Sequence, residues 1–79
     1  MTVENVKNSL SNARKMADGE DKKLEISIAL SDAEFFGYND YGSGVYTPPA
    51  DFRDEPDLLA SWKEGQKSAR KDAMNPEYD

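Results

Sequence analysis

Carboxylates are the side chains of this sequence that are best able to do chemistry, and they are concentrated in its middle. Residues 24–58 contain eight aspartates and glutamates but a single arginine, a formal charge of −7 in a chain whose total is −6. Two carboxyl groups with separated pKa values can act as a catalytic acid and base. The sequence has no histidine and no cysteine, so it lacks the commonest general base, a thiolate nucleophile and the usual zinc ligands. We expect a protein that is not an enzyme and uses no cofactor.

The remaining chemical motifs are equally incomplete. Asp18, Glu20 and Asp21 stand close together, but they lack the twelve-residue loop and terminal glutamate of a calcium site. The glycine-containing stretch 37–44 has neither the dinucleotide fingerprint nor the phosphate-loop lysine. The sequence therefore predicts no metal site and no phosphate-binding loop.

The acidic middle instead predicts binding to a basic partner. Phosphate affinity comes from lysine and arginine, so direct contact with nucleic acid is electrostatically unfavourable here. Spaced carboxylates can imitate the charge of a phosphate chain and steer rapidly to a basic surface. We expect an interaction protein that blocks the basic surface of a nucleic-acid-binding protein or complex, as a phage-type anti-defence or host-takeover inhibitor does; a merely solvated acidic face is the plainer alternative. The candidate contact residues are Glu34, Asp40, Asp51, Asp54, Glu55 and Asp57 as charge mimics, with Tyr38 and Tyr41 as aromatic anchors.

The size of the chain limits the fold that can position these residues. Seventy-nine residues, 37% of them hydrophobic, can form one small domain over residues 1–79. No apolar run approaches the roughly 20 residues of a membrane span. Residues 1–10 carry Glu4 and Lys7 where a signal peptide needs an apolar core. We therefore expect a cytoplasmic protein with no membrane contact.

The first 30 residues are predicted to form a helix and an extended segment. Apolar residues at three- and four-residue steps predict a helix from just after Thr2 to about Ala17, ended by Asp18-Gly19. Alternation of apolar and other residues over 24–30 favours a strand. Such a strand needs a partner, either residues 45–47 or a second copy of itself in a homodimer. The alternative is a helix that begins near Asp21 and continues into the next segment.

Residues 31–74 are predicted to form a helical hairpin, which makes the fold mainly α. Ser31 and Glu34 fit a capping box for a helix from residue 32 to about 41. Glycines and the pair Pro48-Pro49 then end this helix. Pro56 fits the first turn of the last helix, whose apolar stripe is centred on Trp62 and which ends at Asn75-Pro76. Residues 75–79 are expected to be a tail.

The hairpin region resembles the ribosome modulation factor family. The matching residues are Phe35, Gly37, Tyr38, Asn39, Asp40, Gly44, Pro48, Pro49, Leu59, Trp62, Gly65 and Ala69. The resemblance implies a two-helix hairpin and, by analogy, binding to the small ribosomal subunit. Glycines at 37 and 65 would allow the two helix backbones to approach closely, with Trp62 as an anchor between them. Family members that bind ribosomal RNA are rich in arginine and lysine, whereas this stretch is acidic, so we carry over the hairpin and not the RNA site.

The resemblance also defines the alternative function, a ribosome-associated regulator. In that case the contacts would come from basic residues on the last helix, Lys63, Lys67, Arg70 and Lys71. A third hypothesis is an oligomerisation module that pairs through residues 24–30.

Overall fold

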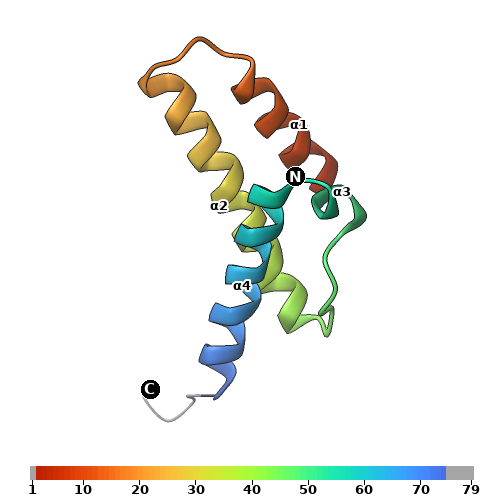
Figure 1. Ribbon diagram of the computed structural model, residues 1–79. Helices are drawn as coiled ribbons and strands as arrows, with labels where there is room; N and C mark the ends of the chain where they lie inside the picture. Colours follow the sequence, from red (N-terminus) through yellow and green to blue (C-terminus); the bar gives the residue numbers. More distant parts are fainter. Residues whose placement is uncertain (1, 75–79) are drawn as a thin grey trace.

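Residues 2–74, the part of the chain that is described in this computed structural model, contain four helices joined by loops (Figure 1). They are α1 (Val3–Arg14), α2 (Glu20–Gly42), α3 (Ala50–Arg53) and α4 (Pro56–Met74). No strand occurs in residues 2–74, so the mainly helical fold class is confirmed. The predicted tail 75–79 and the stop at Asn75-Pro76 lie outside the described residues.

The first helix begins as its sequence predicts. The hydroxyl oxygen of Thr2 accepts a hydrogen bond from the backbone N–H of Asn5 (3.2 Å), which satisfies one of the unpaired amides of the first turn. The helix ends at Arg14, one turn earlier than the predicted end at Ala17. Gly19 precedes the first residue of α2 and does not end α1, so the assignment of Asp18-Gly19 as the stop of α1 was wrong.

Residues 24–30 lie within α2, so the predicted extended segment was wrong and the alternative helix is correct. The apolar residues of this segment divide between two faces of the helix. Ile26 and Leu30 pack against the core, whereas Leu24 and Ile28 are exposed. A helix that is apolar on two sides has no single amphipathic stripe, and its residues can imitate the alternation of a strand. Because α2 continues through Ser31, the predicted capping box does not form either.

The end of α2 is fixed by the glycine signal in the sequence. Gly44 adopts a φ of 82°, which disfavours any residue with a side chain. Its N–H donates to the carbonyl of Tyr41 (3.1 Å), and the N–H of Val45 donates to the carbonyl of Asp40 (2.7 Å). These two bonds form a Schellman motif, which satisfies carbonyls that the helix end would leave unpaired.

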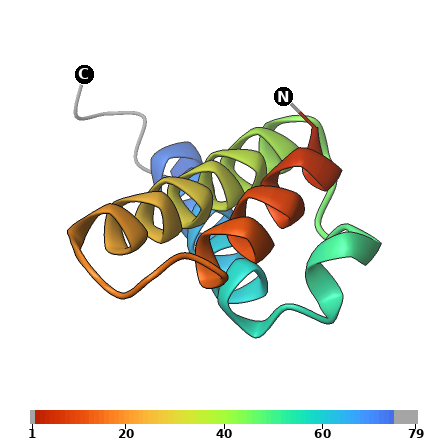
Figure 2. The same cartoon turned by 90° about the horizontal axis from the view of Figure 1, so that it is seen from above.

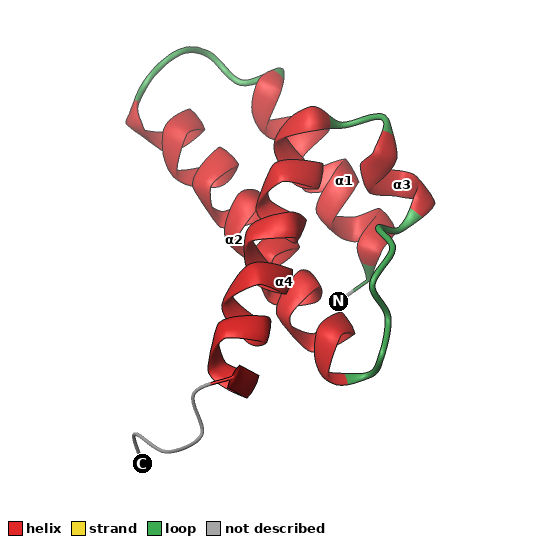
Figure 3. Ribbon diagram, turned by 60° about the horizontal axis from the view of Figure 1, so that its bottom comes forward, coloured by secondary structure: helices red, strands yellow, loops and turns green. Residues whose placement is uncertain are grey.

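The C-terminal hairpin is formed by α2 and α4, which share the most extensive contact between helices. Residues 43–55, including α3, run back past α1 before α4 begins, and α4 then crosses α2 (Figures 1 and 3). At the crossing, a Cβ atom on Gly37 would collide with the backbone carbonyl of Trp62, and one on Gly65 would collide with that of Glu34. The predicted close approach of the two helix backbones at these glycines is confirmed.

All four helices contribute to one core. Seen from above, α1 lies beside α2, with α3 and the start of α4 to one side (Figure 2). The buried residues of this core are Val6 and Leu10 from α1, Ala29 and Ala33 from α2, Phe52 from α3, and Leu58 and Trp62 from α4. Phe36 meets Phe52 edge to face, with ring centroids 6.4 Å apart. Within the described residues no helix is long and apolar enough to cross a membrane.

Candidate functional site

The carboxylates at the junction of α3 and α4 pair with basic residues of α1. Lys7 Nζ lies 3.2 Å from Asp54 Oδ1. Arg14 bridges two acids, with Nη1 2.6 Å from Glu55 Oε1 and Nη2 3.1 Å from Asp57 Oδ2. The charge of these three predicted mimics is therefore offset in part within the molecule, and the ion pairs join α1 to the start of α4.

Arg14 is the centre of this network. The hydrogen bond to Glu55 is the main reason that the pKa of Arg14 is raised above its ordinary value, and the charges of Glu55 and Asp57 add to the effect. A guanidinium is charged at every accessible pH. The pairing therefore depends on the carboxylates and on salt, and not on the titration of arginine.

We expect Arg14→Gln to lower the free energy of unfolding by about 0.5–1 kcal/mol, because the pairs of Arg14 are partly exposed and solvent screens them. Urea unfolding of Arg14→Gln, Glu55→Gln and the double variant would isolate the coupling of this pair. Lys15→Gln is the matched control, since it removes a neighbouring positive charge that has no ion pair with another described residue. Equal effects of Arg14→Gln and Lys15→Gln would contradict the structural role of the network.

The other two predicted carboxylates of this region differ in their surroundings. Asp40 Oδ2 accepts a hydrogen bond from the indole N–H of Trp62 (2.9 Å), so this carboxylate faces the contact between α2 and α4. Asp51 is half-buried on α3 and forms no ion pair with another described residue. The structure thus does not gather the six predicted mimics into one continuous patch, because Glu34 lies on the outer side of α2, apart from the junction acids.

An exposed apolar line along the outer face of α2 is the feature that the preferred strand prediction missed, although the alternative helix places Leu24, Ile28 and Phe35 on one face. We call this line the outer stripe: Leu24, Ile28, Phe35 and Tyr38, with exposed fractions of 58%, 46%, 57% and 41%. With Ser31 between them, these positions follow steps of four, three, four and three residues, which place them on one side of a helix. The opposite side, which includes Ala29, Ala33 and Gly37, is buried. The same spacing is visible in the sequence once residues 24–30 are taken as helix.

Carboxylates border the outer stripe on both sides. In helical projection Asp21, Glu25 and Asp32 fall along one border, and Glu20 and Glu34 fall along the other. Glu34 was a predicted contact residue, whereas Glu25 and Asp32 were not. None of the five forms an ion pair with another residue of the described chain, and among the basic residues of α2 Lys23 falls nearest to these borders in helical projection.

The predicted aromatic anchors occupy different places. Tyr38 belongs to the outer stripe, and its hydroxyl donates a hydrogen bond to Asp72 Oδ2 on α4 (2.6 Å), which fixes the ring. Tyr41 is half-buried and meets Tyr46 edge to face, with centroids 5.2 Å apart. Only Tyr38 therefore lies with Glu34 on the same surface.

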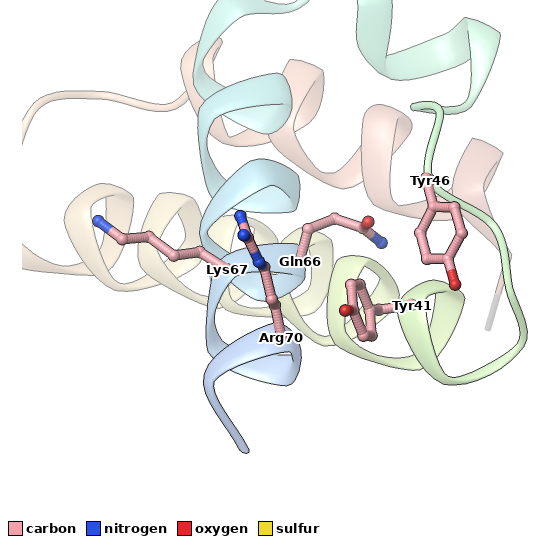
Figure 4. A pocket seen from close by; sticks show the side chains of 5 residues that line it. All are labelled: Tyr41, Tyr46, Gln66, Lys67 and Arg70. Carbon is pink, nitrogen blue, oxygen red and sulfur yellow. The ribbon is translucent and has the colours of Figure 1, made fainter. Parts of the chain in front are cut away.

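Tyr41 and Tyr46 instead line a second site, an open depression of about 460 Å³ that we call the tyrosine pocket (Figure 4). Gln66, Lys67 and Arg70 complete its lining. Gln66 Nε2 donates to the carbonyls of Gly37 (2.6 Å) and Val45 (3.1 Å), which ties the 43–49 loop to α4. Figure 4 shows the two rings near each other and the side chain of Lys67 extending away from them. The lining thus combines two phenol rings with two cationic side chains.

Residues 2–74 contain no group of three or more acidic side chains placed to hold a metal ion. Comparison of the chain with protein-family models, with curated proteins and with solved structures gives no match.

Proposed function

We propose that this protein is a non-enzymatic interaction protein that binds the basic surface of a nucleic-acid-binding partner through the outer face of α2. The observation that carries the proposal is the exposed outer stripe bordered by carboxylates that have no ion pair with another described residue. Exposed apolar side chains that lie together on one face, unlike scattered single ones, are typical of a surface that another molecule covers. The acidic borders select a partner of opposite charge.

The junction acids have a different part in this proposal. Asp54, Glu55 and Asp57 are already paired with Lys7 and Arg14 of α1, so we place the contact surface on α2. They still add to the total charge of −6. This charge steers the molecule toward a basic surface at separations shorter than the Debye length, beyond which salt screens the attraction.

Occupation of such a surface would make the protein an inhibitor. A basic groove that is covered by acidic side chains cannot hold the phosphate backbone at the same time, because both compete for the same lysines and arginines. The specific form of this role that we propose is a phage-type inhibitor of host defence or host nucleic-acid metabolism. The small size and the acidic middle of the chain support it.

We expect the triple variant Glu25→Lys, Asp32→Lys, Glu34→Lys to lose the capture of basic proteins from a bacterial lysate at low salt. The matched control is Glu4→Lys, Asp51→Lys, Glu64→Lys, which changes the net charge by the same amount away from the outer face of α2. Quantitative mass spectrometry of the captured proteins is the measurement. Equal loss in both triple variants would show that net charge alone governs binding, and unchanged capture by the α2 variant would overturn the proposal.

A second candidate function, a ribosome-associated regulator of the modulation-factor type, is favoured by the opposite side of the hairpin. The tyrosine pocket lies beside Lys67 and Arg70, and Lys63 and Lys71 are also exposed on α4. The two functions predict opposite outcomes in the same capture experiment. Recovery of intact ribosomal subunits, retained or improved by the lysine substitutions on α2, would favour the second.

A further inference from the structure

We propose that the outer stripe of α2 docks a single amphipathic helix of the partner, with an apolar face bordered by lysine and arginine. This inference rests on the proposed function and specifies the kind of structure that the partner presents. The observations behind it are the spacing of the stripe, the charges beside it and the two hollows at its ends.

The spacing of the stripe fits a helix. Steps of four, three, four and three residues from Leu24 to Tyr38 are those of the a and d positions of a heptad, the pattern by which two helices interlock side chains. At 1.5 Å per residue the stripe is about 21 Å long, which corresponds to about four turns of a docked helix. An extended peptide could not form backbone hydrogen bonds with it, because those of α2 are used within the helix.

The borders of the stripe specify the charge of the docked helix. Residues that flank the a and d positions select partners through their charge. Here Glu25 and Asp32 stand on one border and Glu20 and Glu34 on the other. A helix with lysine or arginine on both sides of its apolar face would pair with these carboxylates, whereas an acidic helix would be repelled.

The same borders argue against a second copy of this chain as the occupant. Pairing of two α2 stripes, in either direction, would bring acidic borders against acidic borders in molecules that each have a net charge of −6. They also argue against an anionic lipid surface, which attracts helices with basic borders. Charge complementarity therefore favours a basic helix.

Two hollows beside the stripe can each hold a side chain of the docked helix. A depression of about 410 Å³ lies between α1 and α2 and includes Met16, Leu24 and Glu25 in its lining. A second, of about 320 Å³, is lined by Ser31, Glu34, Phe35 and Tyr38. Each hollow combines apolar side chains with a carboxylate of the border, so each can take an apolar side chain with a basic neighbour.

Two synthetic peptides of about 20 residues, long enough to be helical, would test the inference. Both have leucine at the a and d positions; one has lysine at the flanking positions and the other glutamate. In fluorescence anisotropy with the full chain, we expect the lysine peptide to bind and the glutamate peptide not to. Ile28→Gln with Phe35→Gln should weaken binding of the lysine peptide about tenfold or more, because these side chains are central in the stripe. The matched control, Val45→Gln with Met74→Gln, changes two apolar residues outside the stripe that are also exposed, and this variant should bind as the original chain does.

Three results of the peptide-binding and sedimentation experiments would overturn the inference. The first is equal binding of both peptides. The second is unchanged binding of the lysine peptide by the Ile28→Gln, Phe35→Gln variant, because this result would mean that the peptide binds by non-specific charge attraction. The third is a dimer in analytical ultracentrifugation that this variant abolishes, with no binding of the lysine peptide, which would identify a second copy as the occupant. The lysate capture experiment separates this inference from the proposed function. If the Ile28→Gln, Phe35→Gln variant still captured basic proteins and the triple lysine variant of α2 did not, the proposed function would stand and the docked helix would be ruled out.

Discussion

Replacement of Gly65 by alanine should lower the free energy of unfolding by about 3 kcal/mol, because it overpacks the crossing of α2 and α4. A Cβ atom at this position would collide with the carbonyl oxygen of Glu34 and would stand 2.7 Å from the backbone N of Tyr38. Both are backbone atoms of α2, so a change of side-chain rotamer cannot relieve the contact. The helices would have to separate, and this would also disturb the packing of Trp62. Urea unfolding followed by circular dichroism is the measurement.

Gly42→Ala is the control for this effect. Gly42 is the last residue of α2, and a Cβ atom there would meet nothing within 4 Å. Alanine is the better helix former by about 1 kcal/mol in a helix interior, so the control should be as stable as the original chain or slightly more stable. Equal stability of Gly65→Ala and Gly42→Ala would contradict the close crossing of the two helices.

The close crossing is also the part of the fold that the sequence predicts best. Glycine inside a helix is unfavourable, so two such glycines near a tryptophan need a tertiary reason, and close approach of two backbones supplies it. The Thr2 cap and the glycine end of α2 were predictable for a different reason. Each depends on residues that are neighbours in the chain, and local chemistry decides the outcome.

Residues 24–30 were predicted wrongly because their pattern fits two structures. Leu24, Ile26, Ile28 and Leu30 alternate as a half-buried strand does, but as a helix they divide between the core and the outer stripe. The choice depends on what surrounds them, since α1 and the rest of the core cover Ile26 and Leu30. Packing between distant segments overrides local propensity here, and the local sequence pattern does not show how these segments pack.

The candidate site could be predicted only in part, for the same reason. The excess of carboxylates is a property of composition, and it is plain in the sequence. The pairing of Arg14 with Glu55, across 41 residues, and of Lys7 with Asp54, across 47, arises from the return of the chain past α1. Sequence reasoning therefore counted these acids as one patch with Glu34, whereas the structure places them on different parts of the molecule.

Trp62 gives the second large expected effect: Trp62→Ala should lower the free energy of unfolding by about 4 kcal/mol. The indole is 2% exposed and lies in the core that joins α1, α2, α3 and α4. Its removal would leave a cavity in the core, and a domain of this size has little stability in reserve. Trp62→Phe keeps most of the buried surface and removes the hydrogen bond to Asp40, so we expect a loss of about 1 kcal/mol. A cost of Trp62→Ala close to that of an exposed substitution such as Lys63→Ala would contradict the central position of the indole.

The partner of this indole allows folding and binding to be separated. Asp40→Asn keeps an oxygen that can accept the indole N–H and removes the negative charge, so the chain should remain folded. Because the carboxylate of Asp40 faces the contact between the helices, we expect its loss to leave capture of basic proteins unchanged. Glu34→Gln removes the same charge from the border of the outer stripe and should weaken capture, since that carboxylate is exposed. Reversal of this order would mean that the negative charge at the helix crossing, and not the outer face of α2, attracts the partner.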